Sequence, residues 1–167
     1  MIQIIQADIV DQSTDAIVNA ANEMLLAGSG ISGAIHAAAG RHLELECAQI
    51  GRCPTGGACI TSGYNLKARY VIHAVAPKYW DGTRDEARLL RKTYRSIYEV
   101  ALKHGLGSLS IPAIGTGIYR FPLAEATKIA YQEATNFERY ISIVFVCFDE
   151  KSFQAYQQEA AYYRHKN

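Results

Sequence analysis

Hydrophobic residues recur along the chain with two periods, and each period predicts its own kind of element. Short apolar or alternating runs, bounded by glycine, proline or polar residues, predict strands. We expect strands at residues 2–6, 16–19, 58–62, 70–75, 109–112 and 141–148. The last of these runs is continuously apolar, which is typical of a strand buried on both faces.

Apolar residues spaced three and four apart predict the helices. The longest pattern covers residues 84–102, with one stripe formed by Leu89, Leu90, Tyr94, Ile97, Tyr98 and Ala101. Further helices are expected at 33–39, 122–137 and 151–163, and residues 42–49 either extend the first of these or form another. Because strands and helices alternate, the sequence predicts an α/β fold with a largely buried, mixed sheet.

Length and charge narrow the classes of protein to consider. The 167 residues suit one domain with a single sizeable core. The formal net charge of +1 does not indicate nucleic acid or an anionic membrane as a partner held by electrostatic attraction. The sequence has no apolar run of transmembrane length and no signal-peptide pattern, so we expect a cytoplasmic protein.

The four cysteines bear on the question of a metal site. They are Cys47, Cys53, Cys59 and Cys147, and no two of them form a C-x-x-C pair. Zinc ligands usually lie closer together along the chain. We therefore expect reduced thiols and no metal ion.

Two glycine-containing loops carry the candidate chemistry. Gly28–Gly33 and Gly115–Tyr119 each follow an expected strand and precede an expected helix. Such loops direct backbone N–H groups at one spot beside the positive end of a helix dipole, which suits phosphate. The alternative is an ordinary turn in which Ser32 caps the helix. Together with Asn19 and Asn22 between them, the two loops predict a site for a nucleotide diphosphate.

Several motifs in order give the chain a resemblance to a known family. They are Asp8-Ile9, Asn19-Ala-Ala-Asn22, Gly30-Ile-Ser-Gly33-Ala-Ile-His36, Cys53-Pro-Thr-Gly56, Val71-Ile-His-Ala-Val75, Pro112-Ala-Ile-Gly-Thr-Gly-Ile-Tyr119 and Cys147-Phe-Asp149. This set resembles the macro domain family, and most of all its bacterial MacroD-type branch. The resemblance implies one macro domain over residues 1–167, with three α/β/α layers, a central mixed six-stranded sheet and an ADP-ribose cleft.

The resemblance also implies a role for each matching residue. Asp8 and the Ile9 amide would bind adenine, with Phe148 stacking nearby; the alternatives are a solvated turn residue and a core phenylalanine. Tyr119 would cover the distal ribose, and Asn22 would orient that ribose and the reacting water as the catalytic residue. The remaining ligand-binding positions, most of them around the diphosphate, are Ala20, Gly30, Ile31, Ser32, Gly115, Thr116, Gly117 and Ile118.

Other polar residues near these motifs receive structural roles. Asn19 is expected to brace its loop through backbone hydrogen bonds. His73 alternates with Val71 and Val75 on a strand and is expected in the core, while His36 is expected to pack or brace the loop. Arg120 either contacts a phosphate or lies in solvent. No cofactor and no metal ion is expected.

The first loop departs from the family pattern at one position. MacroD-type hydrolases usually have an aspartate where this chain has Ser32, and the pKa of a serine hydroxyl is far too high for an unaided general base. Viral macro domains with a small residue there still cleave ADP-ribosyl esters, in a proposed route where the substrate's diphosphate polarises the water. Losing a general base slows such a reaction by about 10²–10⁴-fold without abolishing it.

Three hypotheses about function follow. The first is hydrolysis of ADP-ribose esters, either O-acetyl-ADP-ribose or mono-ADP-ribosyl aspartate and glutamate on proteins. The second is a reader that binds ADP-ribose without turnover, which Ser32 favours. The third is a nucleotide- or RNA-binding protein that uses the same cleft, against which the near-neutral charge argues.

Overall fold

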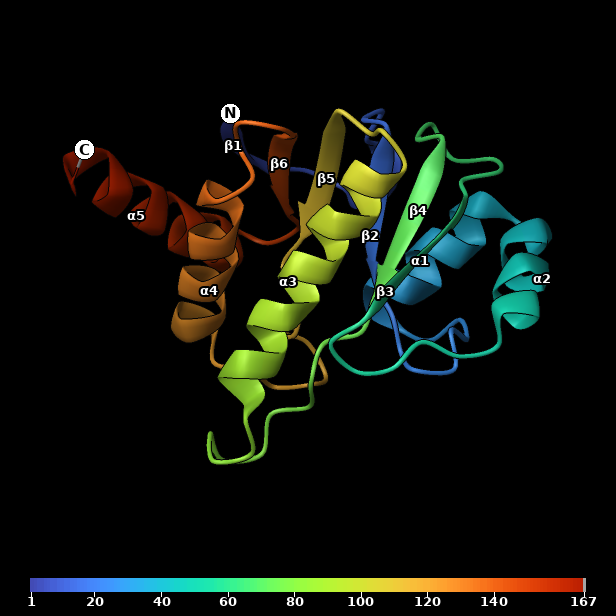
Figure 1. Ribbon diagram of the computed structural model, residues 1–167, viewed down its shortest axis with the longest axis horizontal. Coiled ribbons are helices and arrows are strands. Elements are labelled where there is room, and N and C mark those ends of the chain that lie inside the picture. Colours follow the sequence, from blue (N-terminus) through green and yellow to red (C-terminus); the bar gives the residue numbers. More distant parts are fainter. Residues whose placement is uncertain (167) are drawn as a thin grey trace.

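The computed structural model describes residues 1–166, which form one sheet with helices on both faces (Figure 1). The strands are β1 (Ile2–Gln6), β2 (Ala16–Ala20), β3 (Ala58–Ser62), β4 (Tyr70–Ala74), β5 (Ser108–Pro112) and β6 (Ser142–Cys147). The helices are η1 (Ile9–Asp11), which is a short 3-10 turn, and α1 (Gly30–Ala39), α2 (Arg41–Ile50), α3 (Glu86–Lys103), α4 (Leu123–Thr135) and α5 (Glu150–Lys166).

The sheet is mixed, as the sequence predicts. Its strand order is β1-β6-β5-β2-β4-β3, and β3 runs antiparallel to β4 while the other neighbouring strands are parallel. The parallel strands β1, β6, β5, β2 and β4 therefore end at the same edge of the sheet. Loops that follow these strands meet there, which is the edge where open α/β sheets bind ligands.

Two hydrophobic clusters lie on opposite faces of the sheet and define three layers. On β4, Val71 belongs to the cluster beneath α1 and α2, whereas its neighbour Ile72 belongs to the cluster beneath α3, α4 and α5. Successive strand residues point to opposite faces, so both faces are apolar and both need helices to cover them. The predicted α/β/α fold with a six-stranded mixed sheet is confirmed.

Helix boundaries differ from the prediction at the first glycine loop. The helix expected at 33–39 begins at Gly30, three residues earlier, so Ser32 lies inside its first turn and Ser29 holds the N-cap position. Residues 42–49 belong to a separate helix because Gly40, with φ at +90°, turns the chain between α1 and α2. The helical period alone reveals neither the start of α1 nor the break between α1 and α2, because glycine and serine carry little hydrophobic signal.

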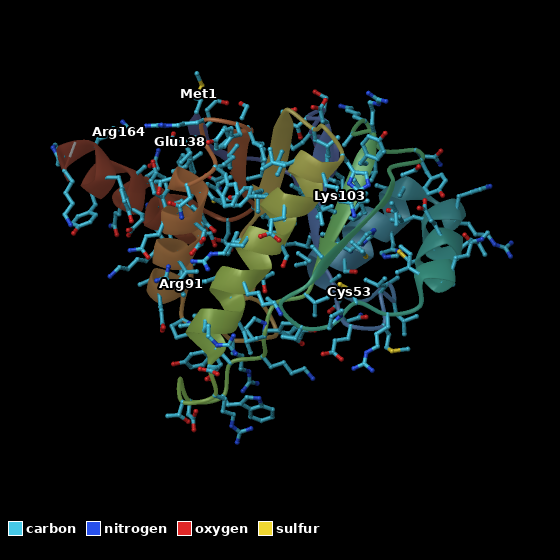
Figure 2. The ribbon with its side chains drawn as sticks, viewed as in Figure 1. Met1, Cys53, Arg91, Lys103, Glu138 and Arg164 are labelled. Atoms are coloured by element: carbon cyan, nitrogen blue, oxygen red, sulfur yellow. The ribbon has the colours of Figure 1, made fainter. Side chains whose placement is uncertain are left out.

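The amino-terminal ends of the parallel strands lie at the edge opposite the ligand-binding one. Figure 2 shows Met1 beside Glu138 there, where the N-terminal amine donates a hydrogen bond of 2.8 Å to the Glu138 carbonyl. Within residues 1–166, no helix has the length and apolar character needed to cross a membrane.

Candidate functional site

An open cavity of about 790 Å³ lies over the carboxyl ends of the parallel strands. Its walls come from the segments that follow β1, β2, β5 and β6. All the ligand-binding positions expected from the sequence contribute to its lining: Asp8, Ile9, Ala20, Asn22, Gly30, Ile31, Ser32, Gly115, Thr116, Gly117, Ile118, Tyr119 and Phe148. Residues far apart in the chain therefore meet in one cleft.

The first loop is held by the side chain of Asn22. Its Nδ2 donates to the Leu26 carbonyl at 3.0 Å, and its Oδ1 accepts from the Leu26 N–H at 3.1 Å. A carboxamide has two donor hydrogens and an oxygen with two lone pairs. One hydrogen and one lone pair of Asn22 thus remain for a ligand or a water molecule in the cleft.

A clamp on Glu23 adds a second constraint to the same loop. Thr55 Oγ1 donates to the Glu23 carboxylate at 2.6 Å, and Arg52 Nη2 donates to it at 3.1 Å. These two hydrogen bonds lower the pKa of Glu23, and the bond from Thr55 has the larger effect. The Glu23 carbonyl also accepts from the Cys53 N–H at 2.8 Å, so the backbone next to Asn22 is fixed from two sides.

Helix α1 presents its first turn to the cleft. Its first backbone bond runs from the Gly33 N–H to the Ser29 carbonyl, and the N–H groups of Gly30, Ile31 and Ser32 donate to nothing within residues 1–166. A Cβ on Gly33 would collide with the Gly28 carbonyl, so the loop packs this closely only against glycine. Free N–H groups at the positive end of a helix dipole form an anion-binding surface.

The second loop faces the first with another set of free N–H groups. Gly115 adopts φ at +85°, and the Phe121 N–H closes the loop on its carbonyl at 2.8 Å. In the part of the chain that the structure describes, the N–H groups of residues 115–119 donate no hydrogen bond. Successive free amides in a turn form a concave anion site. The two loops together suit a diphosphate, which has oxygens on both sides.

Exposed apolar side chains stand at the cleft's rim. Phe148 is 78% exposed and Ile118 is 80% exposed, although both are large hydrophobic residues. Apolar exposure at a concave site is typical of a surface that a ligand covers. Of the two interpretations of Phe148, the core position is wrong, because β6 ends one residue before it.

Asp8 lies at the β1–β6 side of the cleft. Its Oδ1 accepts the Val10 N–H at 3.1 Å and thereby caps η1. Its other carboxylate oxygen accepts no hydrogen bond from residues 1–166, so it is available to a donor such as an amino group. Asp8 therefore combines a structural role with a free acceptor at the cavity wall.

A buried polar group lies behind the first loop. Asn19 Nδ2 donates to His73 Nδ1 at 3.1 Å, and His73 Nε2 lies 2.9 Å from Thr61 Oγ1. Burial, together with the neighbouring His36, lowers the pKa of His73 to about 3, so its ring is neutral at pH 7. The expectation that Asn19 braces the loop backbone is wrong, because its carboxamide binds His73 on the neighbouring strand β4; Asn22 braces the loop instead.

Ser32 and His36 are buried polar residues on α1, one turn apart. Neither the Ser32 hydroxyl nor the His36 ring has a hydrogen-bond partner among the described residues. Burial lowers the pKa of His36. Ser32 lines the cavity, but its hydroxyl oxygen is itself buried. Arg120 is exposed with φ at +62° and does not line the cavity.

Some positions of the site carry no signal in the hydrophobic pattern. Asp149 caps α5 by accepting the Ser152 N–H at 2.7 Å, and together with Lys151 it lines the cavity beside Phe148. Asp149 stands three residues before Ser152, a spacing that suggests a helix cap. The Glu23 clamp joins residues 29 and 32 positions apart, and such distant pairs leave no trace in a single sequence.

Fold and site together define an α/β protein with an anion-binding cleft at the carboxyl ends of parallel strands. The family described as "Macro domain" matches residues 18–130. This chain belongs to the macro domain family.

Relatives and solved structures agree with this assignment. An O-acetyl-ADP-ribose deacetylase of Escherichia fergusonii is 42% identical over 165 residues, covering 94% of this chain and 93% of that protein. The macrodomain of Oceanobacillus iheyensis with ADP has a TM-score of 0.94 at 36% identity, covering 98% of this chain and 92% of that one. A Trypanosoma brucei macrodomain in complex with ADP-ribose has a TM-score of 0.88 at 41% identity, covering 94% and 68%.

Proposed function

We propose that this protein binds ADP-ribose and hydrolyses its esters. The substrates are O-acetyl-ADP-ribose or mono-ADP-ribose attached to aspartate and glutamate side chains of proteins. The observation that carries the proposal is the pair of loops with free N–H groups on facing sides of one cavity. The relative named as a deacetylase and the related macrodomain with bound ADP-ribose support it.

In this proposal the ligand lies across the sheet edge. Adenine occupies the β1–β6 side, where Asp8 accepts from its amino group and Phe148 covers its face. The diphosphate lies between the first turn of α1 and the second loop. The distal ribose then lies against Tyr119, within reach of Asn22. The whole described chain serves as one domain around this ligand.

The reaction needs a water molecule directed at the ester-bearing end of the ligand. Ser32 cannot serve as an unaided base, because a hydroxyl loses its proton only far above neutral pH. Asn22, with its spare hydrogen and lone pair, holds the water, and a diphosphate oxygen of the substrate polarises it. The water oxygen bonds to the ribose carbon that carries the ester, and the carboxylate leaves with the electron pair of the broken C–O bond. The attacking oxygen keeps one of its protons as the new ribose hydroxyl and gives the other to solvent.

Positioning and fixed dipoles supply the catalysis in this scheme. The histidines behind the loop are neutral, and the free N–H groups are fixed dipoles. Neither contributes an ionised side chain to the site. Orientation of water and substrate lowers the barrier without a protein base. A carboxylate is also a good leaving group, so the reaction depends less on acid–base help.

The second candidate is a reader module that binds ADP-ribose without turnover. It is favoured by the partnerless Ser32 hydroxyl at the position where related hydrolases have a carboxylate. A Ser32→Asp variant that gains activity in an otherwise inactive protein would support the reader.

Calorimetric titration with ADP-ribose, followed by incubation with O-acetyl-ADP-ribose, tests the proposal. We expect one binding site per chain and release of acetate well above the rate without protein. Binding without release supports the reader. Absence of ADP-ribose binding contradicts both candidates.

A further inference from the structure

The loop between β4 and α3, residues 75–85, carries an exposed aromatic surface outside the cleft. Figure 1 shows this green segment extending beyond the first turn of α3, away from the sheet. Trp80 is 64% exposed, and the Arg84 guanidinium carbon lies 4.9 Å from its ring centroid. We call Lys78, Trp80 and Arg84 the Trp80 platform. Tryptophan and arginine are enriched where proteins bind partners.

The backbone beneath the platform is fixed by one buried carboxylate. Glu86 accepts hydrogen bonds from four backbone N–H groups, those of Trp80, Asp81, Gly82 and Arg84. Burial would raise the pKa of Glu86, but the four donors outweigh it and bring the pKa to about 2. The carboxylate thus stays charged at neutral pH. A surface organised before binding loses less entropy when a partner arrives.

The platform is joined directly to the cleft. The Tyr79 N–H donates to the Tyr119 carbonyl at 2.8 Å, and Lys78 Nζ lies 5.9 Å from the Tyr119 ring centroid. In the strand order, β4 lies beside β2 and away from the β1–β6 side. Whatever is attached to a ribose against Tyr119 therefore leaves the cleft next to the platform.

The charges around the platform favour an acidic partner. Lys78, Arg84 and Arg120 are exposed and form no ion pair with any residue in 1–166. Of the two acidic side chains of the loop, Asp85 pairs with Arg88 at 3.2 Å, whereas Asp81 accepts hydrogen bonds from Thr83 and keeps its negative charge. Three unpaired cations thus outnumber the one unpaired carboxylate of the loop, and this excess of positive charge beside the cleft exit complements carboxylates.

We propose that the Trp80 platform binds the acidic polypeptide segment that carries an ester-linked ADP-ribose. The proposal rests on the proposed function, because that function places the ribose against Tyr119. A modified glutamate or aspartate within an acidic segment brings further carboxylates to Lys78 and Arg84, and an apolar neighbour to the Trp80 ring. The protein then recognises the carrier as well as the nucleotide.

Single-stranded nucleic acid fits this surface less well. Such polymers need a continuous track of free cations along the backbone path. Further along α3, Arg91 and Arg95 both pair with the buried Glu133, at 3.6 and 2.9 Å, and Arg88 pairs with Asp85. On the side of α3 where Figure 2 labels Arg91, four cations lie together, and three of them form ion pairs. Only Lys92 among them forms none within residues 1–166, so this side offers no continuous track of free cations.

The test compares two ligands by calorimetry. One is free ADP-ribose, and the other is an acidic ten-residue peptide with ADP-ribose on a central glutamate through a non-hydrolysable bond. We expect the conjugate to bind about tenfold more tightly, a gain typical of one aromatic and one charged anchor. Trp80→Ala and Arg84→Glu should each remove most of that gain and leave the affinity for free ADP-ribose unchanged.

Matched controls come from the opposite end of the molecule. Tyr140, 67% exposed, and its neighbour Arg139 lie just before β6, at the amino-terminal edge of the sheet. Tyr140→Ala and Arg139→Glu should leave the gain intact. An equal gain with a lysine-rich peptide, equal binding of conjugate and free ligand, or tighter binding of an ADP-ribosylated oligonucleotide overturns the proposal. Failure of free ADP-ribose to bind overturns the proposed function itself, a different and separately visible result.

Discussion

The two ends of the cleft are built in different ways. At the β1–β6 end, Asp8 and Phe148 line the cleft, and the Phe148 side chain is largely exposed. At the β2 end, Asn22 is tied to Leu26, and Tyr119 is bonded to the loop after β4. The β1–β6 end offers an exposed aromatic ring, which suits a flat aromatic ligand. The β2 end offers polar groups held in fixed positions, which suit the orientation of a reacting water. Binding and turnover should therefore respond to different substitutions.

The largest expected effect is on turnover, at the β2 end. Asn22→Ala removes the group that holds the water, and a single positioned polar group is worth about 10²–10³-fold in rate. We expect ester hydrolysis to fall by about 100-fold while the affinity for ADP-ribose changes less than about tenfold. Rates of acetate release and calorimetry measure the two. Asn136→Ala, at the exposed end of α4, is the control; a rate unchanged by Asn22→Ala removes this residue from the mechanism.

The close packing of the first loop predicts the next effect. In Gly33→Ala the new methyl group collides with the Gly28 carbonyl, so the loop must move. Overpacking of this kind costs about 1–3 kcal/mol. We expect lower stability in urea and weaker ADP-ribose binding. The added methyl of Gly28→Ala meets nothing within 4 Å, so this control should keep the parental stability in urea; equal losses of stability in the two variants would contradict the packing described.

Acidification should lower the stability of the protein through His73, which lies behind the β2 end of the cleft. Folding keeps the pKa of His73 near 3, below its ordinary value of 6.5, because the buried ring is neutral. The contribution of the neutral His73 ring to the free energy of unfolding is complete above pH 6.5. It is lost as the pH falls toward 3, because the unfolded chain binds a proton at His73 and the folded chain does not. From pH 7 to 5 we expect the free energy of unfolding to fall by about 2 kcal/mol through this residue.

Urea unfolding of His73→Gln at both pH values checks this prediction. The variant should be less stable at pH 7, and its stability should depend less on pH than that of the parent. His42→Gln, at an exposed position, should keep the parental pH dependence. A His73 variant with the full parental slope would show that other groups cause the loss.

The smallest expected effect lies at the β1–β6 end. Phe148→Ala removes an exposed ring proposed to stack on adenine, and such stacking is worth about 1–3 kcal/mol per base. We expect the affinity for ADP-ribose to fall about tenfold, with the rate at saturating ester within twofold of the parent. Kinetics over a range of O-acetyl-ADP-ribose concentrations separate these quantities. A fall in the saturated rate with unchanged affinity would reverse the assignment of the two ends.

The sequence predicts the sheet better than the details of the loops. Strands such as β6 are strongly apolar, so their position follows from burial alone. The start of α1 at Gly30 could not be predicted in this way, since it depends on the Gly28 carbonyl packing against Gly33. The cleft residues could be listed from family motifs, but the bracing of the first loop by Asn22 instead of Asn19 could not. It depends on which carboxamide faces His73 across neighbouring strands.

A crystal structure of the protein with ADP-ribose tests the central claim most directly. The account predicts diphosphate oxygens within hydrogen-bond distance of the N–H groups of α1's first turn and of residues 115–119. It also predicts adenine beside Asp8 and the distal ribose against Tyr119. A diphosphate bound elsewhere, or a ligand lying in the reverse direction with adenine at Tyr119, would contradict it.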